Sequence, residues 1–298
     1  LVMVALVLCM FIVSLVAISI FMNLNISEIF GHVYQSTIGS EFGFLSVLRR
    51  TTYLLVVSLG LAVAFSSGVW NIGGEGQILW GALLAVAVSL LLVLPAYVMI
   101  PLALITGFIA GALWGLIAGF LKAKWNVNEI VSTMMLNFVA TATMVQIAGG
   151  ILRDPVVLIA QTKMIPEDLQ FPFIIYPLNV AFLMSLALIP VVYVLMRKSV
   201  LGYKMRIVGG ASTVAAAAGI NTGRMIMISM FISGGVCALA GVLLVFGQFF
   251  RAQSAMTGLF GFYAIVSTLL GRSRPEWMLF MSLLLSFIIT GTESLRVL

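Results

Sequence analysis

Charged residues are rare along the chain, and long apolar intervals lie between them. No Asp, Glu, Lys or Arg precedes Glu28, and none lies between Arg50 and Glu75 or between Glu75 and Lys122. A helix needs about 20 apolar residues to cross a bilayer, so each interval can hold one crossing and the last can hold two. The pattern predicts nine membrane-spanning helices, near residues 1–24, 51–69, 77–94, 100–121, 130–149, 179–196, 225–247, 257–271 and 277–295.

Composition supports this assignment to the membrane. Hydrophobic residues make up 62% of the 298 residues, charged residues make up 8%, and the mean hydropathy is +1.22. Soluble domains average about 45–50% apolar and about 25% charged residues. The sequence therefore predicts one all-α, polytopic transmembrane domain over residues 1–298. Because the chain begins with Leu1 and stops shortly after an apolar run, we expect residues to be missing at both ends.

The distribution of basic residues predicts the orientation. Threading nine helices through a membrane puts nine Lys and Arg with three acidic residues on one face, and six basic with six acidic residues on the other. Since basic residues favour the cytoplasmic side, the first face and the N-terminus are predicted to be cytoplasmic. Segments 25–50 and 150–178 are then extracytoplasmic loops. Topology accounts for the basic excess, which therefore indicates no nucleic-acid partner.

Residues 68–81 read GVWNIGGEGQILWG and separate two apolar stretches with glycines, amides and a carboxylate. Non-helical backbone at membrane depth must be satisfied by protein or water, so such a break favours a pair of interrupted helices that line a solute path. The alternative is a tight turn in which Asn71 and Glu75 only cap the next helix. The predicted path residues in this break are Asn71, Gly73, Gly74, Glu75 and Gln77.

Two predicted loops have compositions that suggest partners. Segment 197–224 places basic residues around a glycine pair and a short Ala-rich helix, VAAAAGI, which is too short to span a membrane. It is either an interfacial helix on anionic lipid or a docking element for a soluble partner. Segment 153–177 contains four prolines and mixed charge. It is either a solvated loop or a receiving surface for an extracytoplasmic protein.

Several chemistries have no sequence signal. The chain has no GxxxxGK[ST] phosphate loop, no metal-ligand spacing and no serine at motif distance from a base. No ionisable residue lies in the middle of a predicted span, which disfavours ion-coupled transport. We therefore expect neither an enzyme nor a cofactor bound by this chain. Energy for transport must come from another protein, or transport is passive.

The chain resembles the permease subunits of bacterial ABC importers for nucleosides and related compounds, within the wider family of ribose and branched-chain amino-acid permeases. The resemblance covers most of the chain from about Ser58 onward. The family pattern differs at Ala211-Ser212, Ala216-Ala217 and Tyr263-Ala264. The resemblance rests on NIGGEGQ, on LWGLIAGFLKAKWNVNEIVSTMMLNFVA from Leu113, on Asp154-Pro155, Gln161-Thr162 and Ile165-Pro166, and on GYKMRIVG, AGI, ISGGVCALAGVLLVFG and GFYAIVSTLLG.

This resemblance implies a ten-helix permease in the bacterial plasma (inner) membrane, of which the present chain holds about nine spans. It implies three protein partners: a second, similar permease, a cytoplasmic ABC ATPase that uses ATP, and an extracytoplasmic substrate-binding lipoprotein. It adds Asn137, Phe262 and Tyr263 to the predicted solute path. It also implies that the ATPase is coupled through the cytoplasmic segment at about 197–224, with the contact residues Gly202, Arg206, Gly209, Ala216, Ala217 and Gly219.

The cargo and the class of transporter stay open at the level of sequence. The cargo could be a purine nucleoside, a nucleobase, a sugar or a vitamin. Trp70, Trp80, Phe262 and Tyr263 could stack on a planar base, or the tryptophans could be membrane-interface residues. The alternative to an importer permease is a self-contained facilitator or channel for a small polar solute, which would need no ATPase.

Overall fold

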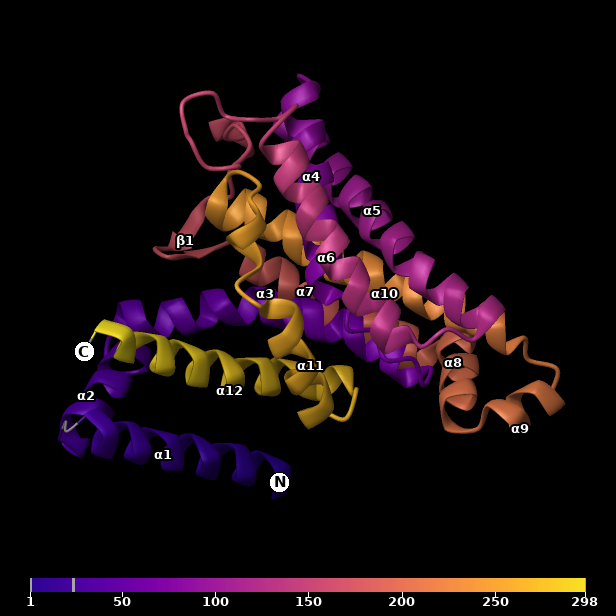
Figure 1. Ribbon diagram of the computed structural model, residues 1–298, viewed down its shortest axis with the longest axis horizontal. Helices are drawn as coiled ribbons and strands as arrows, with labels where there is room; N and C mark the ends of the chain where they lie inside the picture. The colour runs from indigo at the N-terminus through magenta and orange to yellow at the C-terminus, as the bar shows by residue number, and fades with distance from the viewer. Residues whose placement is uncertain (1, 23–24, 298) are drawn as a thin grey trace.

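The chain is predominantly helical in a computed structural model that describes residues 2–22 and 25–297 (Figure 1). A short antiparallel hairpin, β1 (Phe173–Ile175) and β2 (Leu178–Asn179), lies among 3₁₀ and π-helical turns. The α-helices are α1 (Val2–Met22), α2 (Ile26–Thr37), α3 (Glu41–Ser66), α4 (Gly74–Leu91), α5 (Ala96–Trp125), α6 (Glu129–Ala148), α7 (Ala181–Tyr193), α8 (Val200–Gly210), α9 (Ser212–Ala217), α10 (Thr222–Leu244), α11 (Phe260–Leu270) and α12 (Pro275–Ser294).

The prediction of an all-α polytopic bundle is confirmed. Among the described residues, eight helices are long and apolar enough to cross a membrane. The ninth predicted span, 257–271, is shorter than the others: its apolar helical stretch is Ser254–Leu270, and α11 begins only at Phe260. The chain reverses just before α11, where Gly258 and Leu259 both have positive φ angles of 53° and 63°. The described part of the chain thus combines eight long apolar helices with the shorter helices α2, α8, α9 and α11.

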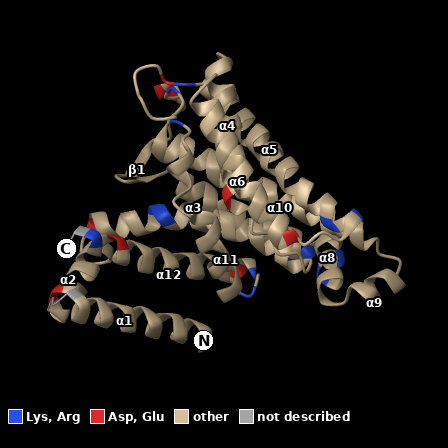
Figure 2. Cartoon of the chain, in the orientation of Figure 1, with Lys and Arg blue, Asp and Glu red and all other residues tan. Residues whose placement is uncertain are grey.

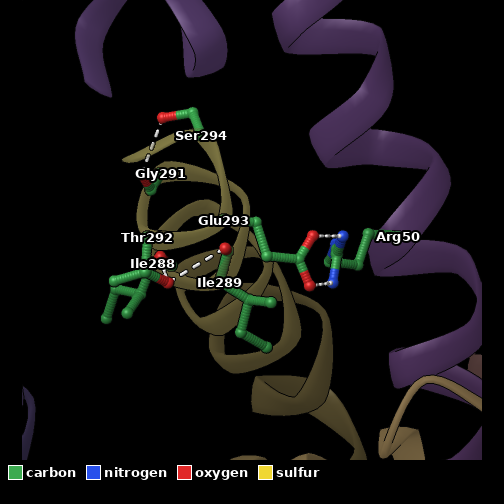
Figure 3. A network of polar contacts seen from close by, with 7 residues as sticks. All are labelled: Arg50, Ile288, Ile289, Gly291, Thr292, Glu293 and Ser294. Carbon is green, nitrogen blue, oxygen red and sulfur yellow. Dashed lines mark hydrogen bonds and ion pairs between the residues drawn. The ribbon is translucent and has the colours of Figure 1, made fainter. Parts of the chain in front are cut away.

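Residues 25–50 are largely helical, so the prediction of a loop there is wrong. The α2 helix occupies most of the segment, and α3 begins at Glu41, capped by the Ser40 hydroxyl, which accepts a hydrogen bond from the Gly43 amide at 3.0 Å. Arg50 lies inside α3 because Glu293 of α12 pairs with its guanidinium through both carboxylate oxygens (Figure 3). Counting charges cannot detect such pairing between distant helices. Which side of the membrane this segment occupies stays a prediction.

Charged side chains are concentrated away from the middle of the bundle (Figure 2). Basic residues gather around α8 and at the nearby turns, whereas the segment around α4, α6 and α10 is almost free of charge. At the opposite edge, α1 packs against α2 and the 3₁₀ turn that follows α12 through a small cluster formed by Leu15, Ile29, Val33 and Leu295. This arrangement agrees with a body whose middle lies in hydrocarbon.

The core is built around α10, which packs against α3, α4 and α5 (Figure 1). Small residues allow these helices to approach closely, as is common in membrane bundles. A Cβ atom at Gly81 of α4 would lie 2.1 Å from the Ala238 carbonyl oxygen of α10, and one at Gly241 would lie 2.0 Å from the Ile78 carbonyl oxygen. Backbone, and not a movable side chain, blocks both positions. These glycines therefore set the distance between α4 and α10.

This packing predicts opposite effects for two glycine-to-alanine changes in helices. Gly81→Ala should lower the thermal unfolding temperature, because overpacking against backbone costs about 1–3 kcal/mol. Gly31→Ala in α2 is the matched control, since no atom lies within 4 Å of its Cβ position and alanine favours helix by about 1 kcal/mol. Thermal melts of both purified variants in detergent test this. Equal melting temperatures for the two variants would contradict the assigned α4–α10 contact.

Candidate functional site

The predicted glycine break is an extended linker between α3 and α4. The helix α3 ends at Ser66, α4 begins at Gly74, and residues 67–73 between them form what we call the linker. Gly68 within it has a φ of 73°, a left-handed conformation that glycine adopts without strain. The chain thus leaves helical conformation between Ser66 and Gly74, and the last four residues of NIGGEGQ already belong to α4. That the break lines a solute path stays a prediction.

Hydrogen bonds among Asn71, Gln77 and Ser233 connect the linker to α4 and α10. The Asn71 amide nitrogen donates to Gln77 Oε1 at 3.1 Å and to Ser233 Oγ on α10 at 2.9 Å. In return, Gln77 Nε2 donates to Asn71 Oδ1 at 3.1 Å. Asn71 is fully buried and Gln77 nearly so, which means that these bonds replace water that cannot reach them. We call this arrangement, with the α6 and Glu75 contacts described below, the polar knot.

The helix α6 supplies the remaining partners of the linker backbone. Asn137 Oδ1 accepts from the Gly76 amide at 2.8 Å, and Asn137 Nδ2 donates to the Ile72 carbonyl at 2.9 Å. Thr133 Oγ1 accepts from the Ile72 amide at 3.2 Å. A helix leaves its first amides without internal partners, so Asn137 satisfies one of the orphan donors of α4. Asn137 is thus part of the polar knot, and its predicted place on the solute path stays a prediction.

Glu75 connects α4 to the start of α11. Its carboxylate is 6% exposed, and Oε1 accepts a hydrogen bond from the Gly261 amide at 2.7 Å. No ion pair among the described residues involves Glu75. The carboxyl group lies instead in the first turn of α4 and against the first turn of α11, where two helix dipoles favour its ionised form. From its place in α4, Glu75 therefore caps α11, whose Gly261 lies 186 positions away in sequence.

A close backbone approach makes this contact possible. A Cβ atom at Gly261 would lie 2.5 Å from the Glu75 amide nitrogen, and one at Gly74 would lie 3.2 Å from the Gly261 Cα. The two helices thus begin side by side with no side chain between their backbones. Phe262, which is 37% exposed, and the partly buried Tyr263 follow directly on α11.

The structure thus brings most of the predicted path residues into one place. Phe262 and Tyr263 lie in the first turn of α11. The other predicted path residues meet at the linker and the start of α4: Asn71, Gly73, Gly74, Glu75, Gln77 and Asn137. Sequence reasoning missed Thr133, Ser233 and Gly261. Thr133 lies four residues before Asn137 on the same helix face, and this spacing is a signal that could have added Thr133 to the candidate residues. No local pattern indicates that Ser233 contacts Asn71.

The predicted coupling segment forms two short helices, α8 and α9, before the chain enters α10. Ala216 and Ala217 are exposed on α9, whereas Ala215 is fully buried, and Gly219 turns the chain with a φ of 76°. Arg206 is partly buried, and among the described residues its Nη1 has no hydrogen-bond partner.

Two glycines of this segment contact the chain itself. A Cβ atom at Gly202 would lie 2.3 Å from the Leu195 carbonyl oxygen, and one at Gly209 would lie 2.4 Å from the Ser66 carbonyl oxygen. A cleft of about 670 Å³ beside Gly209 is lined by the start of the linker, Lys122 and Asn126, the α8–α9 corner and the first turn of α10. The α8–α9 segment is therefore packed against the linker.

Comparisons with known proteins place the chain among transport permeases. The family model described as branched-chain amino acid transport system, permease component, matches residues 43–297. The chain is 29% identical over 289 residues to a glucose ABC transporter permease protein of Haloferax volcanii, covering 93% of this chain and 76% of that protein. It is 35% identical over 252 residues to a guanosine ABC transporter permease protein of Bacillus subtilis, covering 82% of this chain and 69% of that protein.

A nucleoside ABC transporter permease protein of Lactococcus lactis subsp. cremoris is 29% identical over 276 residues, covering 88% of this chain and 76% of that protein. No solved structure matches the chain significantly. The family match spans the linker, the polar knot and the α8–α9 segment together, and the eight long apolar helices agree with it. The chain therefore belongs to the family of branched-chain amino acid transport system permease components and is a membrane permease subunit of an ABC importer.

Proposed function

We propose that this permease moves an uncharged, nucleoside-like solute across a bacterial plasma membrane, with its N-terminus in the cytoplasm. Two of the similar proteins are named for guanosine and nucleoside transport, and a third for glucose. The observation that carries the proposal is the meeting of α4 and α11 at Glu75. Two helix N-termini would attract an anionic solute, but a carboxylate of the chain already occupies that position. The site therefore favours a cargo without a carboxylate or phosphate.

Aromatic side chains beside the knot suit a planar base. Phe262 and Tyr263 follow Gly261 on α11, and Trp80 of α4 packs on Trp114 of α5 with ring centroids 4.8 Å apart. Trp114 Nε1 lies 3.1 Å from the Cβ position of Gly76, so the pair is next to the first turn of α4. Aromatic faces bind planar rings by stacking at centroid distances of this size. A sugar, the alternative cargo, would stack less extensively on these rings than a planar base.

The proposed partners divide between the two sides of the membrane. On the cytoplasmic side, a separate ABC ATPase binds α8 and α9, where the exposed Ala216 and Ala217 offer a surface of small side chains. On the other side, segment 150–178 and the β1–β2 hairpin receive a substrate-binding lipoprotein. A second permease completes the path. A facilitator that needs no ATPase is the alternative function.

The first test is ATP-dependent uptake by the whole complex. Proteoliposomes that contain the permease with its candidate ATPase and binding protein, and ATP on the ATPase side, should accumulate labelled guanosine above the external concentration. An excess of unlabelled uridine should compete, whereas leucine and guanosine monophosphate should not. Accumulation that persists without the ATPase or without ATP would overturn the importer assignment. Competition by the nucleotide would overturn the uncharged-cargo proposal.

The second test concerns the charge of Glu75. Glu75→Gln should reduce guanosine uptake by about tenfold or more, because a charged hydrogen bond in a dry site contributes about 1.5–3 kcal/mol, of which the amide keeps only part. The matched control is Glu28→Gln on the exposed surface of α2. Initial uptake rates and the amount of assembled complex are measured for both variants. Uptake by Glu75→Gln equal to the control, with equal assembly, would show that the carboxylate plays no part in transport.

The third test concerns the ATPase contact on α9. Ala216→Trp should lower cargo-stimulated ATP hydrolysis and uptake together by about tenfold, since an indole at an exposed alanine holds the partner surface away. Val93→Trp, at an exposed position in the turn between α4 and α5, is the control for adding the same side chain elsewhere. Binding of the ATPase to each permease variant is measured by co-purification. Normal co-purification and uptake by Ala216→Trp would place the ATPase elsewhere.

A further inference from the structure

The end of α8 touches the linker through backbone atoms alone. A Cβ atom at Gly209 would lie 2.4 Å from the Ser66 carbonyl oxygen and 2.7 Å from the Gly68 amide nitrogen. From the other side, a Cβ atom at Gly68 would lie 3.1 Å from the Gly209 Cα. No methyl group fits between the two segments. Residues of α8 and of the linker, more than 130 positions apart in sequence, are therefore in direct main-chain contact.

The neighbouring glycine shows that this contact is specific to one position. No atom lies within 4 Å of the Cβ position of Gly210, although Gly210 is also in α8. Its place at the end of α8 therefore does not by itself explain why residue 209 is a glycine. Sequence analysis assigned Gly209 to the ATPase contact, whereas its missing side chain leaves room for the linker.

Only a short stretch of the linker separates this contact from the polar knot. The linker starts at Ser67, and only seven residues separate α3 from α4. Val69 is 2% exposed and packs in a cluster with Ala64, Ala118 and Met230, which holds the linker against α5 and α10. A cleft of about 670 Å³ borders Ser67, Gly68 and Val69, so the connection to α8 rests on the backbone contact between Gly209 and Gly68. Because no methyl group fits at that contact, a shift of α8 toward the linker would press directly on Gly68.

The far end of the linker is tied to α11. Asn71 and Ile72 are hydrogen-bonded in the polar knot, and four residues after Asn71 the Glu75 carboxylate accepts from Gly261. Because the Gly261 amide is hydrogen-bonded to Glu75, a movement of the linker that reaches α4 also acts on the first turn of α11. The chain of contacts thus runs without a gap from α8 to the first turn of α11.

We infer that Gly209 is a positioning residue that transmits movement of α8 through the linker to Glu75 and α11, and so couples the ATPase to the solute path. This inference rests on the proposed function and gives it a mechanical route inside this chain. A competing route runs directly from α9 into α10, which carries Ser233. The two routes differ in whether a methyl group at the α8–linker contact matters.

The test compares two adjacent alanine variants in the complete transporter. Gly209→Ala should keep ATP hydrolysis within about twofold of the unmodified complex but reduce uptake per ATP hydrolysed by about tenfold. Gly210→Ala should leave both quantities unchanged, since its methyl group meets no atom. Both rates are measured on the same proteoliposomes, together with the amount of assembled complex. A purely structural defect would instead lower assembly and would reduce hydrolysis and uptake in proportion.

A second pair of variants keeps the inference falsifiable if Gly209→Ala does not assemble. One glycine inserted after Trp70, an exposed linker residue, preserves the α8 contact but introduces slack before the knot. One glycine inserted after Val93, in the exposed turn between α4 and α5, is the control. The Trp70 insertion should also separate hydrolysis from uptake, and the control should not. Normal uptake per ATP in an assembled Gly209→Ala complex or in the Trp70 insertion overturns this route, whereas the absence of ATP-driven uptake in the unmodified complex overturns the proposed function itself.

Discussion

The hydrogen bond from the Gly261 amide to Glu75 is the contact on which the rest of the site depends. It places a buried carboxylate between the first turns of two helices and balances its charge with their dipoles, without an ion pair among the described residues. A carboxylate alone in hydrocarbon would be strongly unfavourable. Glu75 can therefore be buried only while α4 and α11 begin together. That condition requires glycines at 74 and 261 and an extended linker before α4.

The same requirement explains the polar side chains around the linker. Seven residues of non-helical backbone within a membrane bundle need hydrogen-bond partners, because neither lipid nor water supplies them there. Asn71, Thr133, Asn137 and Ser233 meet this need from the linker, α6 and α10. With the Glu75–Gly261 hydrogen bond, these contacts join α4, α6, α10 and α11 around the linker.

The predicted coupling segment contains residues in two different environments. Ala216 and Ala217 of α9 are exposed, while Gly202 and Gly209 of α8 pack on the chain's own backbone. Some of the predicted contact residues are thus accessible on the surface, and others are held within the fold. A glycine in a predicted interface can be required by the fold, and only its neighbours in space show which role it has.

The apolar intervals and the rarity of charge were enough to predict an all-α membrane bundle, most helix positions and the break at NIGGEGQ, because burial in hydrocarbon acts on each segment separately. Local sequence also placed Asn71, Glu75, Gln77 and Asn137 among the candidate residues. It could not predict that α3 extends back to Glu41, because Arg50 is held by Glu293 on the last long helix. Nor could it pair Glu75 with Gly261 or Ser66 with Gly209. Those contacts join residues more than 140 positions apart, and helix packing alone determines them, since no local pattern records which backbones approach each other.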